Sequence, residues 1–199
     1  MSDFELKTLQ LARKCLFDQK EQDAFDYYME VFKENSDNPE AAFFSYERAF
    51  TKSMSSPSDN QETRTLFFAV SDSITKAITY AAESSCTKEE KLFLTTILAY
   101  HYLPIANSVI KVPFTSPSER IQLAVTTLYA AGNAIEAAYA PDTESMKLAV
   151  RLWKDGVKLH QQFYSYTYSG NKAEDYVAKI QTVEPDYVMP KKAGCISFG

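Results

Sequence analysis

The segment that decides the fold is LARKCLFDQKEQDAFDYYMEVFKENSDNPEAA, which runs from Leu11 to Ala42. Apolar side chains recur in it at spacings of three and four residues, which is typical of amphipathic helices. Polar residues interrupt this pattern around Asp18 and again around Asn38-Pro39. Asparagine is a good helix N-cap, and proline is well tolerated at the first helical position. The segment therefore predicts a helix, a turn, a second helix and the start of a third.

Particular positions in this segment resemble a tetratricopeptide repeat, a pair of antiparallel helices that stacks on neighbouring pairs. The matching residues are Leu11, Ala12, Ala24 and Tyr28, followed by the turn Asn38-Pro39-Glu40-Ala41. The sequence departs from the repeat at Cys15, Val31 and Ser36, where the family carries an aromatic residue, an alanine and a proline. Taken over about residues 4–50, the resemblance implies close helix packing through small side chains and a protein-binding role.

The rest of the chain predicts more helices but no further copy of the repeat. Capping residues and apolar periodicity predict helices at residues 4–17, 21–35, 39–54, 61–84, 88–112, 117–139, 142–168 and 172–183. Asp18 and Glu21 are predicted to cap the second helix, and Pro104 is predicted to kink or split the fifth. The predicted fold class is all-α, with tetratricopeptide-like antiparallel helical hairpins that continue into a helical bundle or irregular α-solenoid.

The predicted organisation is one all-helical domain over residues 1–184, followed by a tail. A polar stretch around Pro57 separates the tetratricopeptide-like hairpin and its third helix, residues 1–54, from a helical bundle, residues 61–184. Residues 185–199 lack helical periodicity, so they are predicted to be extended or disordered.

Composition and charge limit the classes of partner. The net charge of −5, with no basic run, disfavours binding to nucleic acid or to an anionic membrane surface. No segment approaches 18 uncharged apolar residues, and the acidic start of the chain does not resemble a signal peptide. Three widely spaced cysteines fit a reducing compartment, so a cytoplasmic location is predicted.

Residue patterns that would indicate catalysis or metal binding are absent from the sequence. It has no paired cysteines, no HExxH or HxxxH, no GxSxG and no glycine-rich phosphate loop. We therefore predict no catalytic residues, no metal and no cofactor, and a chain that is not an enzyme. An alternative that stays open is a helical enzyme or small-ligand binder with a pocket near Pro104, Tyr100, His101 and His160.

Tyrosines are the candidate partner-binding residues, because tyrosine anchors many protein interfaces. Tyr27 and Tyr46 lie in the hairpin segment, and Tyr164, Tyr166 and Tyr168 lie near the end of a predicted helix. Each could equally pack within the fold. We predict a non-catalytic interaction or scaffold module that binds a protein or peptide.

Two further questions about partners stay open at this stage. Helices that are apolar on two faces, together with 14% aromatic residues, are also consistent with a structural homo-oligomer. The hairpin segment is locally acidic, so its surface is either a solvated face or a groove for a basic peptide. The acidic residues concerned are Glu5, Asp18, Glu21, Asp23, Asp26 and Glu30.

Overall fold

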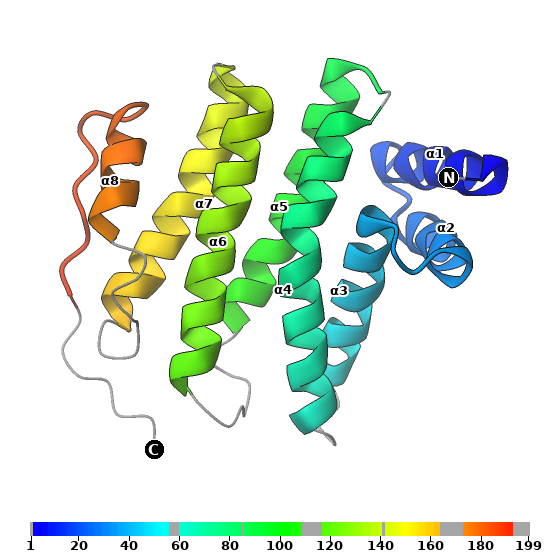
Figure 1. Ribbon diagram of the computed structural model, residues 1–199, viewed down its shortest axis with the longest axis horizontal. Coiled ribbons are helices and arrows are strands. Elements are labelled where there is room, and N and C mark those ends of the chain that lie inside the picture. The colour runs from blue at the N-terminus through cyan, green and yellow to red at the C-terminus, as the bar shows by residue number, and fades with distance from the viewer. Residues whose placement is uncertain are drawn as a thin grey trace. The chain divides into compact units, whose positions relative to one another are not determined.

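The computed structural model describes residues 2–55, 60–84, 86–108, 117–140, 142–163 and 173–192. Within these ranges the chain is all-helical, with eight helices and no strand (Figure 1). The all-α prediction is therefore confirmed. The chain divides into two compact units, Met1–Leu98 and Ala99–Gly199, and the boundary falls inside a helix. The prediction of one domain over residues 1–184 stays a prediction.

Unit 1 is built from two pairs of helices and the beginning of α5. Its elements are α1 (Asp3–Phe17), α2 (Glu21–Glu34), α3 (Pro39–Ser55), α4 (Asn60–Glu83) and the first half of α5 (Lys88–Ser108). α1 packs mainly on α2, and α3 packs mainly on α4. In Figure 1 α1 runs crosswise to α3 and α4, and α2 joins the two pairs by packing on α3.

Local capping explains where several of these helices begin. The Asn38 side chain accepts a hydrogen bond of 3.0 Å from the Ala41 N–H, and Pro39 occupies the first position of α3. At the start of α5, Thr87 and Glu90 form a reciprocal capping box: the Thr87 N–H donates to Glu90 at 2.8 Å, and the Glu90 N–H donates to Thr87 at 3.2 Å. Hydrogen bonds from Thr87 also lower the pKa of Glu90.

The turn between α1 and α2 differs from the prediction. Asp18 does not cap α2; it is the C-cap of α1, and its backbone N–H donates to the Lys14 carbonyl at 2.9 Å. The Lys20 N–H donates to the Cys15 carbonyl at 2.8 Å. Gln19 has a positive φ of 60°, a conformation that is common in the turn at a helix C-terminus. These residues are used to end the first helix, and no side chain caps the second.

The core of unit 1 combines aromatic rings with small residues. Tyr28 and Phe44 stack with their ring centroids 4.4 Å apart, and Phe50 and Phe67 lie 5.8 Å apart. Ala12 and Ala24, the two small residues of the predicted hairpin, are both completely buried. Small side chains at such positions let helix backbones approach closely, while the rings fill the wider gaps.

Unit 2 contains the second half of α5 followed by α6 (Pro117–Tyr139), α7 (Thr143–Gln162) and α8 (Ala173–Gln181). α6 and α7 pack reciprocally, each with a glycine opposite a ring of the other. A Cβ on Gly132 would lie 2.4 Å from the Trp153 indole nitrogen, and a Cβ on Gly156 would lie 2.5 Å from the Tyr129 ring. Tyr129 also stacks on Tyr176 of α8 at 3.6 Å.

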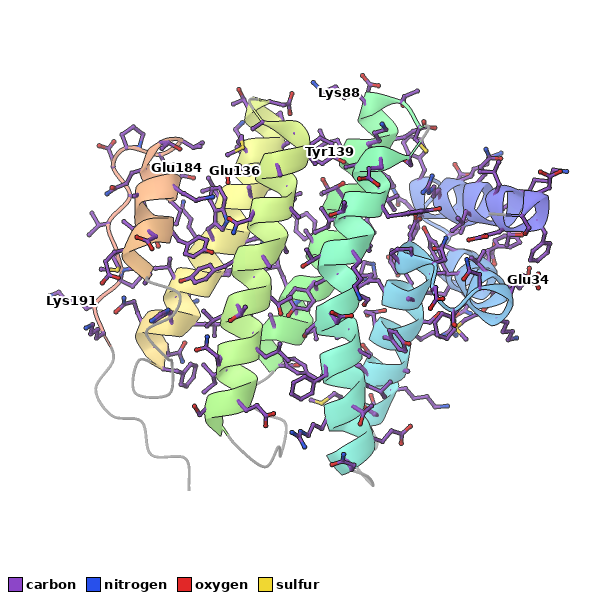
Figure 2. The ribbon with its side chains drawn as sticks, in the orientation of Figure 1. Glu34, Lys88, Glu136, Tyr139, Glu184 and Lys191 are labelled. Carbon is purple, nitrogen blue, oxygen red and sulfur yellow. The ribbon has the colours of Figure 1, made fainter. Side chains whose placement is uncertain are left out.

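Contacts of α8 and of the chain after it complete unit 2. Lys179 on α8 forms an ion pair with Glu136 on α6, and Glu136 is labelled in Figure 2. After α8, Glu184 forms an ion pair with Lys154, and Gln161 donates to the Met189 sulfur at 3.2 Å. The described part of the predicted tail therefore contacts α7.

Two helices differ from their predicted form. α5 continues through Pro104 as one helix and ends at Ser108. Pro104 is exposed, so water can bond the carbonyl that loses its backbone partner. α7 ends at Gln162 and not at residue 168; the N–H of its C-cap, Phe163, donates to the Leu159 carbonyl. None of the helices in the described ranges is long and apolar enough to cross a membrane.

We expect Gly156→Ala to destabilise the protein by about 1–3 kcal/mol, because the new methyl group would overlap the buried Tyr129 ring. Without that overlap, a glycine-to-alanine change inside a helix would stabilise by roughly 0.5–1 kcal/mol. The two effects have opposite signs, so urea denaturation followed by circular dichroism distinguishes them. A gain in unfolding free energy would contradict the close approach of α6 and α7.

Candidate functional site

A buried ion pair joins α1 to α3. The side chain of Glu40 is completely buried and that of Arg13 is 17% exposed, with Arg13 Nη2 2.7 Å from Glu40 Oε2. Arg13 Nε donates to both carboxylate oxygens, at 3.1 and 3.2 Å. The hydroxyl of Tyr28 on α2 donates to Glu40 Oε1. One carboxylate therefore accepts hydrogen bonds from two different helices while belonging to a third.

The electrostatics keep this arrangement charged. Burial alone would lower the pKa of the Arg13 guanidinium, but the charge and hydrogen bonds of Glu40 outweigh burial, and the net shift is upward. Burial, and then the Glu40 carboxylate, raise the pKa of Tyr28 well above 10.0, so its hydroxyl stays protonated and can donate. Glu40 also lies in the first turn of α3, where the helix dipole stabilises an anion.

A second buried carboxylate fixes the beginning of α1. Glu5 is only 4% exposed and accepts hydrogen bonds of 3.0 Å from the side-chain amides of Asn35 and Asn38. The Asn38 amide also lies 3.3 Å from the Tyr80 hydroxyl on α4. Two amides of the α2–α3 turn thus hold the beginning of α1, and Tyr80 of α4 bonds one of them.

A pocket of about 550 Å³ lies beside the last turns of α1 and the N-terminal end of α5, which Lys88 marks in Figure 2. Phe17 and Phe93 form part of its lining and contact edge to face, with centroids 5.3 Å apart. Lys14 and Glu89 supply charge to the lining. The pocket therefore suits a group that is apolar with a polar edge.

Cys86 also lines this pocket, and Arg13 Nη1 donates to its sulfur at 3.0 Å. A catalytic thiol commonly needs a histidine as its general base. Both histidines of the chain, His101 and His160, lie in unit 2, so unit 1 contains no Cys–His pair. Within the described ranges, no three His, Cys, Asp or Glu side chains gather as a metal site. The predicted absence of enzymatic activity, metal and cofactor stays a prediction.

The outer side of α1 carries unusually exposed apolar side chains. Phe4 is 50% exposed, Leu11 is 46% exposed and Phe17 is 65% exposed. Lys7 and Lys14 are also exposed, and the spacing of three and four residues aligns them with Phe4 and Leu11 along one stripe. We call the five residues Phe4, Lys7, Leu11, Lys14 and Phe17 the α1 face.

The sequence did not single out the α1 face. The resemblance to the repeat matched Leu11 to a packing leucine, yet Leu11 is 46% exposed. Phe4 and Leu11 are seven residues apart with Lys7 between them, and this spacing is consistent with an exposed apolar stripe. The same spacing is also consistent with a buried stripe, because burial depends on which neighbours cover the helix.

The tyrosines predicted to bind a partner are only partly described. Tyr27 and Tyr46 are both half-buried, and Tyr46 packs edge to face against Phe32 with centroids 5.4 Å apart. Tyr164, Tyr166 and Tyr168 lie outside the described residues. A role in partner binding stays a prediction for all five.

The alternative ligand site near Pro104 also stays a prediction. Tyr100 is 49% exposed; its hydroxyl accepts a hydrogen bond of 2.9 Å from Arg151, and the guanidinium lies 4.9 Å from its ring centroid. His160 is buried, and its Nδ1 has no hydrogen-bond partner in the described part of the chain. Neither the pocket beside α1 nor a groove between α2 and α3 includes Tyr100, His101 or His160.

Comparison of the chain with family models found no match, and comparisons with curated proteins and with solved structures found none either.

We expect Arg13→Met to destabilise the protein by about 3–5 kcal/mol, because it leaves the buried Glu40 carboxylate without its counter-charge. The double variant Arg13→Met/Glu40→Gln should recover much of this loss, since a neutral amide can still accept the Tyr28 hydrogen bond. Guanidinium denaturation of the two variants and the parent chain measures the coupling. A cost below about 1 kcal/mol for Arg13→Met is the value typical of a surface pair, and it would contradict the buried arrangement.

We expect acidification below pH 6.5 to destabilise unit 2 through His160. Burial lowers the pKa of His160 below its ordinary 6.5; nearby Glu174 opposes this shift and Lys192 adds to it. Between that lowered pKa and 6.5 the unfolded chain binds the proton and the folded chain does not, so stability is lost as pH falls.

Melting temperatures at about pH 8, 6.5 and 5 test this expectation. His160→Gln should flatten the loss between pH 6.5 and 5, whereas the control His101→Gln should retain it. An unchanged pH profile in His160→Gln would show that another group causes the acid sensitivity.

Proposed function

We propose that the chain is a non-catalytic protein-interaction module and that the α1 face is its docking surface. The observation that carries the proposal is the exposure of Phe4, Leu11 and Phe17 on one helix of 15 residues. Large apolar side chains gathered on one exposed helix face mark interaction sites more often than scattered ones do. Covering each of them would contribute up to about 1.5–3 kcal/mol.

The inner side of α1 supports the proposal because it holds the helix in place before any partner binds. Near the beginning of α1, Glu5 accepts a hydrogen bond from Asn35 of the α2–α3 turn, and near its end Arg13 pairs with Glu40 of α3. A face that is already ordered loses little conformational entropy on docking. The adjoining pocket, which shares Lys14 and Phe17 with the α1 face, offers space for one side chain of the partner.

The charges of the α1 face favour a particular kind of partner. Lys7 and Lys14 lie on the same stripe as Phe4 and Leu11, so an amphipathic helix with apolar and acidic side chains complements it. Two copies of the face placed against each other would bring four lysines together, which disfavours self-association there. We therefore favour a different protein as partner over a homo-oligomer formed through this face.

The tetratricopeptide-like character of the α1–α2 hairpin belongs to this proposal. It is supported by the complete burial of Ala12 and Ala24 in two helices that pack on each other. In this interpretation the first hairpin ends an irregular α-solenoid and leaves one helix face open for a partner. The widely spaced cysteines support a cytoplasmic location for such a scaffold.

We expect Phe4→Ser/Leu11→Ser to lower partner binding at least tenfold and to change the melting temperature by no more than a few degrees, because both side chains are about half exposed. The matched control is Val188→Ser, which removes an apolar side chain that is 81% exposed and lies elsewhere. A photo-crosslinking amino acid at position 7 reports binding in cells.

The expected adduct at position 7 contains a protein with an acidic amphipathic helix, and it is lost in Phe4→Ser/Leu11→Ser and kept in Val188→Ser. An adduct of the chain with itself, together with a dimer mass by light scattering, would instead favour the homo-oligomer. Equal crosslinking in both variants would contradict a role for the α1 face.

A further inference from the structure

A second concave surface in unit 1 lies between α2 and α3, away from the α1 face. It is a groove of about 520 Å³. Met29 on α2 and Ala49 on α3 contribute apolar lining, and Ser45 on α3 also lines the groove. Charged residues of both helices supply the rest, so the groove is an amphipathic surface and not an apolar one.

The charge of this groove is opposite to the one that the acidic sequence of the hairpin suggested. Asp26 and Glu30 line it together with Lys33, Arg48 and Lys52, so cations exceed acids by one. Arg48 is already engaged: its Nη1 lies 3.4 Å from Asp26, and its guanidinium lies 5.5 Å from the Phe25 ring centroid.

Two cations remain for a ligand. Among the described residues, Lys33 and Lys52 make no ion pair. Of the two acids that line the groove, Glu30 also makes none, whereas Asp26 pairs with Arg48. The groove therefore presents two ammonium groups against one carboxylate. Because the whole chain is acidic, with a net charge of −5, this surface differs in sign from the average surface of the protein.

Ser45 provides an independent indication that the groove takes a ligand. Its side chain is 7% exposed, and its hydroxyl has no hydrogen-bond partner in the described part of the chain. Other helical serines of this chain, such as Ser53 and Ser73, donate to the carbonyl three residues earlier. Buried polar groups are rarely left unpaired. Because this hydroxyl is shielded from water, unpaired and part of the groove lining, it can donate a hydrogen bond to a polar group bound there.

We propose that the α2–α3 groove binds an acidic peptide segment. Carboxylates of the peptide pair with Lys33 and Lys52, a peptide carbonyl or carboxylate accepts the Ser45 hydroxyl proton, and apolar atoms of the peptide cover Met29 and Ala49. This site is separate from the α1 face, so either surface can bind without the other.

The test uses a fluorescein-labelled peptide of alternating glutamate and leucine and, for comparison, one of alternating lysine and leucine, each titrated with the full chain by fluorescence anisotropy. We expect the acidic peptide to bind and its affinity to fall with added salt. Lys33→Glu/Lys52→Glu should weaken it at least tenfold with an unchanged melting temperature. No binding of the acidic peptide, or tighter binding of the basic one, overturns the proposal.

The matched control is Lys158→Glu/Lys191→Glu, which makes the same change of net charge at two exposed lysines outside the groove and the α1 face. Wild-type affinity in this control, together with the tenfold loss in Lys33→Glu/Lys52→Glu, assigns the acidic peptide to the groove. If the control loses as much affinity as Lys33→Glu/Lys52→Glu, the binding reflects net charge, and the groove assignment fails while the function proposed for α1 remains.

Ser45→Ala gives a signature that a purely structural serine would not give. Removing an unpaired buried hydroxyl should leave the melting temperature unchanged or raise it, because no hydrogen bond of the free protein is lost. The same variant should weaken the acidic peptide at least threefold. Wild-type affinity in Ser45→Ala would overturn the hydrogen bond that we assign to the ligand.

Discussion

The buried pair of Arg13 and Glu40 is the interaction on which unit 1 depends. Removing two charges from water is costly, so such a pair is tolerated only when geometry and further hydrogen bonds compensate. Here the compensation comes from Tyr28 and from the first turn of α3. Because these groups belong to three helices, α1 cannot slide or rotate on α2 without leaving a charge unpaired. The orientation of every exposed side chain on α1 follows from this constraint.

Unit 2 obtains a defined arrangement by a different means. Its helices α6 and α7 meet where one has a glycine and the other presents a ring, at Gly132 with Trp153 and at Gly156 with Tyr129. The constraint there is shape and not charge. A small displacement of α6 along α7 would force a ring into a backbone, so close packing limits the alternatives as strongly as an ion pair does.

The sequence predicted what is decided locally. The beginnings of α3 and α5 follow from Asn38-Pro39 and from Thr87 with Glu90, because each cap is completed within three residues. The end of α7 and the use of Asp18 were predicted wrongly, because Phe163 and Asp18 close their helices through backbone hydrogen bonds that apolar periodicity does not indicate.

The candidate sites could not be predicted in the same way. The partners of Arg13 and Glu5 lie 27 and more residues away, and no periodicity indicates such pairs. Whether Leu11 is buried or exposed depends on which helix covers it. The charge of the α2–α3 groove depends on which side chains of two helices meet, although the residues concerned are visible in the sequence.

Trp153 is the single tryptophan of the chain, and it is completely buried against Gly132. Its emission should therefore be that of an indole shielded from water, with the Lys179 ammonium 5.0 Å from its ring centroid, and a red shift should report separation of α6 and α7. The half of the molecule that carries the α1 face has no indole, so its melting would be silent at tryptophan excitation and visible by circular dichroism. The chain thus contains a built-in optical probe that distinguishes the unfolding of one half from that of the other.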